Sequence, residues 1–298
     1  MLFRSIKPCK TEDVSANPSN PIPVAIRAII VGAWLAGLIL WEKRRGLRRT
    51  SDNKLHRDLR NLTIGASAGV VMQFCELPVA FTLAQHAELH GWGVVQTLPL
   101  PPLARTAISV ALLDYTLYWW HYFTHRVPFL WRFHRVHHVD REMDATTAIR
   151  FHFGEIAISV LFRAGQVALI GPTPFAVAAW QVFLFLCILF HHANVCLPLA
   201  VERRVARFVM TPRLHGIHHS IQPNEVNSNW SSGFTVWDWL HGTLRTAVPQ
   251  DSIVIGVSGF RDAQSQRLDN SLLLPFRNPV NVPEMSAGSV RQPLSALE

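Results

Sequence analysis

Long apolar stretches limit this chain to folds in which helices enter a lipid bilayer. Residues 24–41 are apolar except for Arg27, and as a helix they would reach about 27 Å, close to the hydrocarbon thickness. Residues 62–85 and 103–120 are also long enough to span. Residues 156–190 contain Gly-Pro-Thr-Pro at 171–174, which predicts a helical hairpin with short halves, inserted shallowly or at a tilt. The fold class is therefore all-α, a polytopic helical membrane protein.

The distribution of basic residues predicts the orientation of these segments. A net charge of +8 would also suit a nucleic-acid partner, but the densest basic stretch, residues 43–49, directly follows the first apolar segment. Residues 42–61 contain eight Lys or Arg, whereas residues 86–102 contain none. The positive-inside rule then places residues 42–61 in the cytoplasm. We therefore expect no nucleic-acid partner and a histidine-rich helical cap on the cytoplasmic side.

Closely spaced histidines are the chemical signature of the chain. Residues three or four positions apart share one face of a helix, and neutral imidazole is a common metal ligand. The nine predicted ligands are His121, His125, His134, His137, His138, His192, His215, His218 and His219. A structural zinc takes four ligands, so this number indicates two metal ions. Imidazole suits iron, copper, zinc and nickel alike, and the residues alone leave the element open.

Other histidines leave alternatives open. His191 and His192 are adjacent, and either ring could be a ligand; we favour His192. His86 and His90 repeat the spacing of His121 and His125, but the expected topology places them on the opposite side of the membrane. We predict that this pair does not bind metal.

Metal-binding imidazoles usually need polar partners that fix their rings. The candidates for this role are Asp114, His152, Glu155, Asn194 and Asn229, with Asp140, Asp144 and Asp238 also near the clusters. His152 could equally be a ligand itself. A carboxylate inside a membrane helix requires a partner. Asp114 shares a helical face with His121 and His125, and we expect it to hold one of these rings; a helix-packing hydrogen bond is the alternative.

The chain divides into four regions by composition. Residues 1–21 are expected to form a flexible tail, 22–120 transmembrane helices, and 121–248 the metal-binding region that includes the membrane hairpin 156–190. Residues 249–298 form a cytoplasmic segment that is partly disordered, with the last 20 residues disordered. The four cysteines show no spacing typical of a zinc site or a disulfide framework.

The sequence around the histidines resembles the fatty acid hydroxylase and sterol desaturase superfamily of membrane non-haem di-iron enzymes. The matching stretches, in order, are DYTLYWWHYFTHR, PFLWRFHRVHHV, TAIRFHFGE, FHHAN, RLHGIHHS and WDWLHGT, within about residues 110–245. The resemblance implies that the nine histidines hold two irons in a cap over a membrane base. The chain departs from the pattern at Phe153, where relatives commonly have proline, and at His241, where an aromatic residue is usual.

The resemblance also implies an activity. A membrane di-iron oxygenase would hydroxylate or desaturate an unactivated C–H position of a lipid, using O2. The chain has no GxGxxG motif and no cysteine cluster, so electrons would come from an external ferredoxin, cytochrome or reductase. We expect a multi-pass protein of a bacterial inner membrane with its active site on the cytoplasmic side.

Three alternatives remain at the level of sequence. One is a desaturase of the same superfamily that modifies a carotenoid or a sterol. Another is a histidine-rich metal transporter, which should carry ionisable residues in several spans, whereas this chain offers Arg27, Glu76, Asp114 and Arg163. The third is a metal-binding protein that has lost catalysis.

Overall fold

The computed structural model describes residues 21–50, 52–277 and 292–297, and in these residues it is helical. The long helices are α1 (Val24–Arg44), α2 (Lys54–Val71), α3 (Leu77–His90), α4 (Pro102–Arg126), α5 (Pro128–His138), α6 (Phe153–Ile170) and α7 (Pro174–His192). The short ones are α8 (Leu199–Val205), α9 (Pro212–His218), α10 (Pro223–Val226), α11 (Val236–His241) and α12 (Leu268–Leu273). The described residues contain no strand, only two isolated bridges. The predicted all-α class is confirmed.

Six of the long helices form the membrane base, namely α1 to α4, α6 and α7. Helices α2 and α3 are continuous through a π-helical turn, Met72–Glu76, and α6 packs against both of them, while α7 packs against α1 and α4. Four helices are long and apolar enough to cross a membrane: α1, the continuous Lys54–His90, α6 and α7. Helix α4 contains the third predicted span and has 25 residues. It is not one of these four helices, because side chains such as Arg105 and Asp114 make it more polar.

The predicted hairpin at residues 171–174 is present. Gly171 ends α6 with a φ of 67°, and a side chain there would collide with the backbone carbonyl of Trp92. Thr173 then caps α7 by accepting a hydrogen bond from Ala176. The expectation of short halves is wrong, since α6 and α7 reach 18 and 19 residues and each is long enough to cross a membrane.

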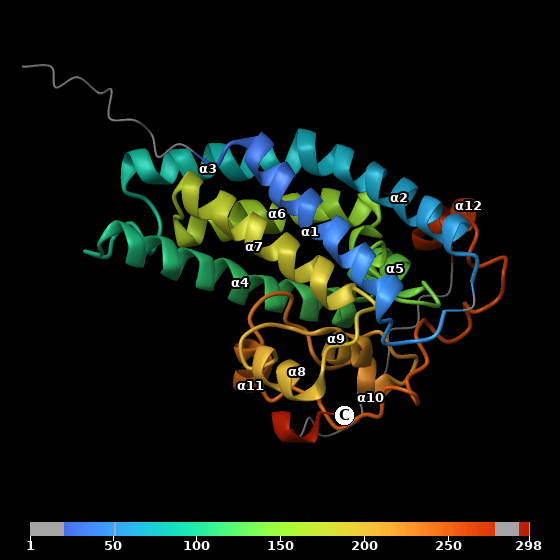
Figure 1. Cartoon of the computed structure of the whole chain (residues 1–298). Helices are drawn as coiled ribbons and strands as arrows, with labels where there is room; N and C mark the ends of the chain where they lie inside the picture. Colours follow the sequence, from blue (N-terminus) through green and yellow to red (C-terminus); the bar gives the residue numbers. More distant parts are fainter. Residues whose placement is uncertain (1–20, 51, 278–291, 298) are drawn as a thin grey trace, which may run out of the picture.

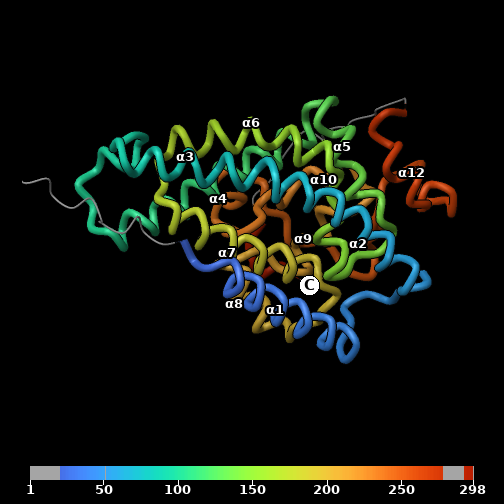
Figure 2. Tube along the Cα trace, turned by 90° about the horizontal axis from the view of Figure 1, so that it is seen from above, coloured from blue at the N-terminus to red at the C-terminus, as the bar shows by residue number. Residues whose placement is uncertain are grey.

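The cap consists of α8 to α11 and the segments around them, and it lies against one side of the bundle (Figure 1). Seen from above, α5, α9 and α10 lie toward the end of the bundle opposite the turn between α3 and α4 (Figure 2). Polar contacts fix this end: Glu42, near the end of α1, accepts hydrogen bonds from the backbone of Ala145 and Asn194, both at 2.8 Å.

The chain end contributes to the cap. Leu297 is fully buried in a cluster with Met210, Leu214 and Leu244, and Gln292 accepts a hydrogen bond from the backbone of Thr246 at 2.7 Å. The predicted disorder of the last 20 residues is therefore wrong for residues 292–297. The predictions for residues 1–20, 278–291 and 298 lie outside the described residues.

Candidate metal centre

All nine predicted ligands meet at the junction of the bundle and the cap, in two groups. The first group contains His121, His125, His134, His138 and His218, and the second contains His137, His192, His215 and His219. All nine side chains are buried. Each ring of a group offers one nitrogen as a ligand atom, and these nitrogens all lie within 4.8 Å of one another.

Helix α5 and the α9 segment each contribute histidines to both groups. His134 and His138, four positions apart on α5, enter the first group, while His137 enters the second. At α9 the pattern is reversed: His215 and His219 enter the second group and His218 the first. The rings of His138 and His219 stack at 4.2 Å between centroids, so the two groups are in contact.

The second group has the spacing expected of ligands around one ion. The Nε2 of His192 lies 3.0 Å from that of His137 and 3.1 Å from that of His215. The Nε2 of His219 lies 3.2 Å from that of His215. Two nitrogens each about 2.1 Å from an ion, at a right angle, are about 3.0 Å apart.

The first group leaves its nitrogens without partners. Among the described residues, no hydrogen bond reaches the buried Nε2 of His121, His125, His134, His138 or His218. A buried polar atom left unpaired costs about 1–3 kcal/mol, and five such atoms converging on one point form a donor set that a metal ion would satisfy. The residues present therefore fit two bound metal ions.

Burial favours the neutral, metal-binding form of five of these rings, those of His137, His138, His215, His218 and His219. Desolvation lowers the pKa of His218 to about 3. Desolvation, and after it the proximity of other histidines, holds the pKa of His137, His138, His215 and His219 well below the usual value. Neutral imidazoles can coordinate without first losing a proton.

Four rings are oriented through Nδ1, which leaves Nε2 for the metal. The Nδ1 of His134 lies 2.8 Å from Oε1 of Glu155, as predicted for this carboxylate. The partners of His121, His192 and His218 are the backbone carbonyls of Trp230, Ile188 and Ser228, at 2.6, 2.8 and 2.8 Å. Backbone carbonyls cannot be recognised as ring partners from a sequence, so these three contacts were missed.

The predicted contact between Asp114 and a histidine ring is wrong. Asp114 accepts hydrogen bonds from the backbone of Phe234 at 2.9 Å and from Nε1 of Trp237 at 2.7 Å. It therefore ties α4 to the cap. Asp238 is the carboxylate that supports His121, because it accepts from the backbone N–H of Trp230 at 2.8 Å.

The other predicted orienting residues act on the backbone, and among the described residues none of the three bonds to a ligand ring. His152 caps α6 by accepting from Gly154 at 2.9 Å, and so positions the helix that carries Glu155. Asn194 holds Arg48 through two hydrogen bonds of 2.8 and 2.9 Å. Asn229 donates to the carbonyl of Leu214 in α9 at 2.8 Å.

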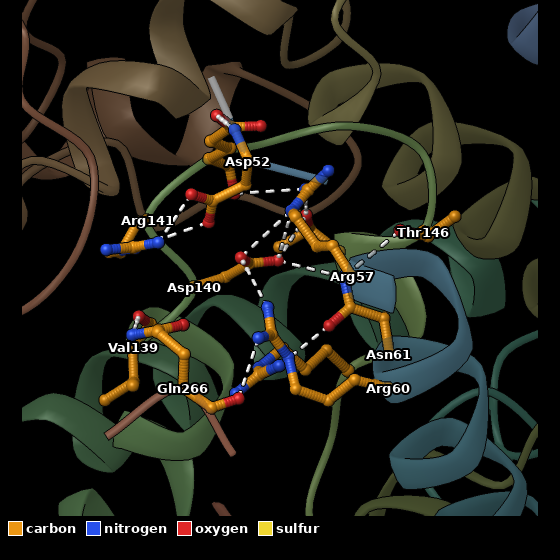
Figure 3. A network of polar contacts seen from close by, with 12 residues as sticks. Asp52, Arg57, Arg60, Asn61, Val139, Asp140, Arg141, Thr146 and Gln266 are labelled. Carbon is orange, nitrogen blue, oxygen red and sulfur yellow. Dashed lines mark hydrogen bonds and ion pairs between the residues drawn. The ribbon is translucent and has the colours of Figure 1, made fainter. Parts of the chain in front are cut away.

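A buried ionic network fixes the end of α5 (Figure 3). Arg57 of α2 donates from Nε to Asp140 at 3.0 Å and from Nη1 to Asp144 at 2.5 Å. Asn61 also donates to Asp140, at 2.9 Å. Burial raises the pKa of Asp144, but the guanidinium of Arg57 outweighs it and holds this pKa below its usual value. Since Asp140 follows His138 by two positions, the network positions the α5 ligands.

An apolar cavity of about 490 Å³ extends from the histidines into the bundle. Its walls come from α2, α4, α6 and α7, and both groups contribute to one end of it, through His121 and His134 and through His137 and His192. Leu62, Ala66 and Gly69 line the cavity and are also exposed on the outer face of α2. The end of the cavity that the histidines line is thus connected to the lateral surface of the bundle.

The sequence that carries these histidines matches a known protein family. The family profile described as Fatty acid hydroxylase matches residues 106–243, a range that contains both histidine groups and Glu155. This match and the relatives of the chain support the fatty acid hydroxylase and sterol desaturase superfamily as its family. Members of the superfamily use iron, and both histidine groups could hold metal ions.

Several members of the superfamily are similar to this chain. Ornithine lipid hydroxylase OlsE of Rhizobium tropici is 29% identical over 228 residues, 74% of this chain and 64% of the relative. Alkylglycerol monooxygenase of Danio rerio is 26% identical over 227 residues, 76% and 49% of the two chains. Cholesterol 25-hydroxylase of Homo sapiens is 30% identical over 146 residues, 49% and 53%. The chain thus spans about half to two thirds of these relatives. No solved structure matches it significantly.

The remaining histidines lie outside the two groups. The rings of His86 and His90 contact each other at a tilt, with centroids 4.2 Å apart. They lie near the end of α3, beside the turn to α4 and far from the cap (Figure 1). His191 is buried beside His215, with centroids 4.0 Å apart, but it belongs to neither group. His241, one of the two departures from the superfamily pattern, stacks on Tyr118 at 5.0 Å.

Proposed function

We propose that this chain is a membrane-bound di-iron oxygenase that hydroxylates an unactivated C–H position of a lipid, using O2 and electrons from an external donor. The observation that carries the proposal is the position of two buried groups of histidines at the end of an apolar cavity. The names of the relatives support the reaction class, since they are hydroxylases and monooxygenases acting on lipids or sterols.

Two irons would be held by the two histidine groups, five rings on one and four on the other. When bound, they would activate O2 and so supply the oxidising power toward a C–H bond that no side chain has. The protein holds the ligand rings in position. Glu155 and the carbonyls of Trp230 and Ser228 hold Nδ1–H of three rings, which directs each Nε2 toward its ion.

The cavity would bind the alkyl portion of the substrate. Leu117, Trp120, Phe162 and Leu184 line it, and burying a methylene group against such walls stabilises binding by about 0.8 kcal/mol. These walls exclude water from the reacting carbon. The exposed cavity residues of α2 provide a route from the bilayer, which fits a lipid that partitions into the membrane.

The basic residues suggest how the protein is oriented in the membrane and where an electron donor docks. The basic residues between positions 43 and 49 lie at the end of α1 and just after it, at the same end of the bundle as the histidines. The positive-inside rule favours the cytoplasmic side for this end, and in our proposal the membrane is a bacterial inner membrane. A basic surface favours docking of an acidic ferredoxin, cytochrome or reductase. In this assignment residues 22–120 form membrane helices, 121–248 the catalytic region with its hairpin, and 249–298 a cytoplasmic segment.

Metal analysis and product analysis of the detergent-purified protein test the proposal. We expect about two irons per chain and a hydroxylated lipid whose formation needs O2 and reductant. His137→Ala should sharply lower the iron content, while the matched change His90→Ala should leave it intact. A full iron complement in His137→Ala would reject the ligand assignment, and an alkene as the main product would replace hydroxylation by desaturation.

A further inference from the structure

An ion pair is buried in the wall of the apolar cavity, away from the histidines. Arg163 of α6 donates from Nε to Oε1 of Glu76 at 3.2 Å, and Ser159 donates to Oε2 of Glu76 at 2.8 Å. Both charged side chains are 8% exposed. All three residues line the same cavity as the metal-binding histidines.

The ion pair between Glu76 and Arg163 is not expected to stabilise the folded protein. Two charges within membrane-spanning helices are costly to desolvate, and apolar replacement of such pairs is often neutral or stabilising. Glu76 also ends the π-helical turn that interrupts the otherwise continuous helix Lys54–His90. Such turns are rare and occur frequently at functional sites.

The guanidinium is held in place with one side available. Gln166 accepts from its Nη1, and its Cζ lies 4.4 Å from the ring centroid of Trp180. Among the described residues, no hydrogen bond is made by Nη2 of Arg163. The pair can therefore offer a donor from Arg163 and an acceptor from Glu76 to a group in the cavity.

Helix α6 sets the distance between this pair and the metal centre. Glu155, Ser159 and Arg163 are spaced by four residues and lie on one face of α6. Glu155 contacts His134, and eight residues further along the helix is about 12 Å. An extended alkyl chain advances about 1.25 Å per bond, so about ten carbons separate the two positions.

We infer that Glu76, Arg163 and Ser159 form a polar subsite that binds a neutral, hydroxyl-type group of the substrate about ten carbons from the oxidised carbon. A hydroxyl both donates and accepts, which matches the pair. A substrate carboxylate would add an unpaired charge to a site whose own charges already cancel, at a high desolvation cost. This inference rests on the proposed function, because it names the class of lipid that the oxygenase takes.

Equilibrium binding to the iron-loaded protein tests the subsite independently of turnover. Trp120 and Trp180 line the cavity, so quenching of tryptophan fluorescence can report binding of dodecane, dodecanol and dodecanoate. We expect dodecanol to bind about tenfold more tightly than dodecane, the worth of a good hydrogen bond to a charged group. Dodecanoate should bind more weakly than dodecanol.

The double variant Glu76→Leu/Arg163→Met removes both charges together and leaves no unpaired one. It should keep dodecane binding and iron content but bring the ratio of the dodecane and dodecanol dissociation constants to about one. The control Arg267→Gln/Asp269→Asn, at an exposed ion pair, should keep the tenfold ratio. If the double variant does not fold, Ser159→Ala provides the second test, and it should lower the ratio by about threefold.

Three results would overturn the subsite: equal binding of dodecane and dodecanol by the unchanged protein, a ratio that persists in the folded double variant, or tightest binding of dodecanoate. An iron-loaded protein that keeps the binding preference but forms no oxidised product would instead reject the proposed function and leave the subsite standing.

Discussion

The Nε2 of His192 lies 3.0 Å from the Nε2 of His137, although 55 positions separate them in the chain. His192 ends α7, a helix long and apolar enough to span the membrane, and His137 lies near the end of α5. This contact joins the membrane base directly to the candidate metal centre, so a shift of α7 would move one of the predicted ligands.

His192 and its neighbour His191 can be separated experimentally. His192→Ala should reduce the iron content from about two to about one per chain, because the second group would fall to three rings. His191→Ala should keep both irons, since His191 belongs to neither group. Elemental analysis of the two purified variants decides between them; the reverse result would make His191 the ligand.

Glu155 should tune metal retention through His134. Removing a partner that orients a ligand typically costs about 10- to 100-fold in metal affinity, and we expect Glu155→Ala to show a loss of this size. Glu155→Gln should lose less, because the amide oxygen still accepts a hydrogen bond from Nδ1. Iron retention measured against a competing chelator gives the comparison. Equal losses in both variants would point to a role for the charge rather than for the hydrogen bond.

Asp114 should affect the attachment of the cap more than the metal. Asp114→Leu leaves the N–H groups of Phe234 and Trp237 without their acceptor, at a cost of about 1–3 kcal/mol for each buried group. We expect a lower thermal unfolding temperature in detergent, with unchanged iron per folded chain. Loss of iron at an unchanged unfolding temperature would contradict the contacts described above.

The carboxylate of Asp144 should make the stability of the protein depend on pH. Its pKa in the folded protein is held below the ordinary value, mainly by Arg57 acting against burial. The stability it contributes is therefore present above the unfolded pKa of about 3.9 and is lost as pH falls toward the folded value. Asp144→Asn should lower the unfolding temperature by a constant amount from pH 8 to 5, and the difference should shrink only below about pH 4. A difference that varies between pH 8 and 5 would indicate another titrating group.

The sequence predicted which histidines come together better than how they divide into two groups. Helical spacing places His134, His137 and His138 close together, but α5 directs His137 to one group and its neighbours to the other. That division depends on where α4, α7 and α9 lie, which is a property of tertiary packing and not of local spacing.

The error at Asp114 has a similar physical cause. Two helical turns, about 10.5 Å, separate it from His121 along α4, so a shared helical face does not bring the carboxylate into contact with the ring. Asp238 supports His121 instead, through the backbone of Trp230. An indirect contact of this kind has no signature in residue spacing. Glu76 was recognised as an ionisable residue in a span, but its π-helical turn and its pairing with Arg163 required the structure.

Gly69 offers a test of the route by which substrate enters. It lines the cavity, it is exposed on α2, and a side chain added there would meet nothing within 4 Å. Gly69→Leu should therefore leave the fold intact, and it should even favour the helix by about 0.8 kcal/mol. The new side chain would obstruct the opening and displace the lipid, and we expect turnover to fall about 10- to 100-fold. The matched control is Gly32→Leu, at a position of α1 that is equally open but does not line the cavity. Iron content should be unchanged in both variants; wild-type turnover in Gly69→Leu would mean that the lipid enters elsewhere.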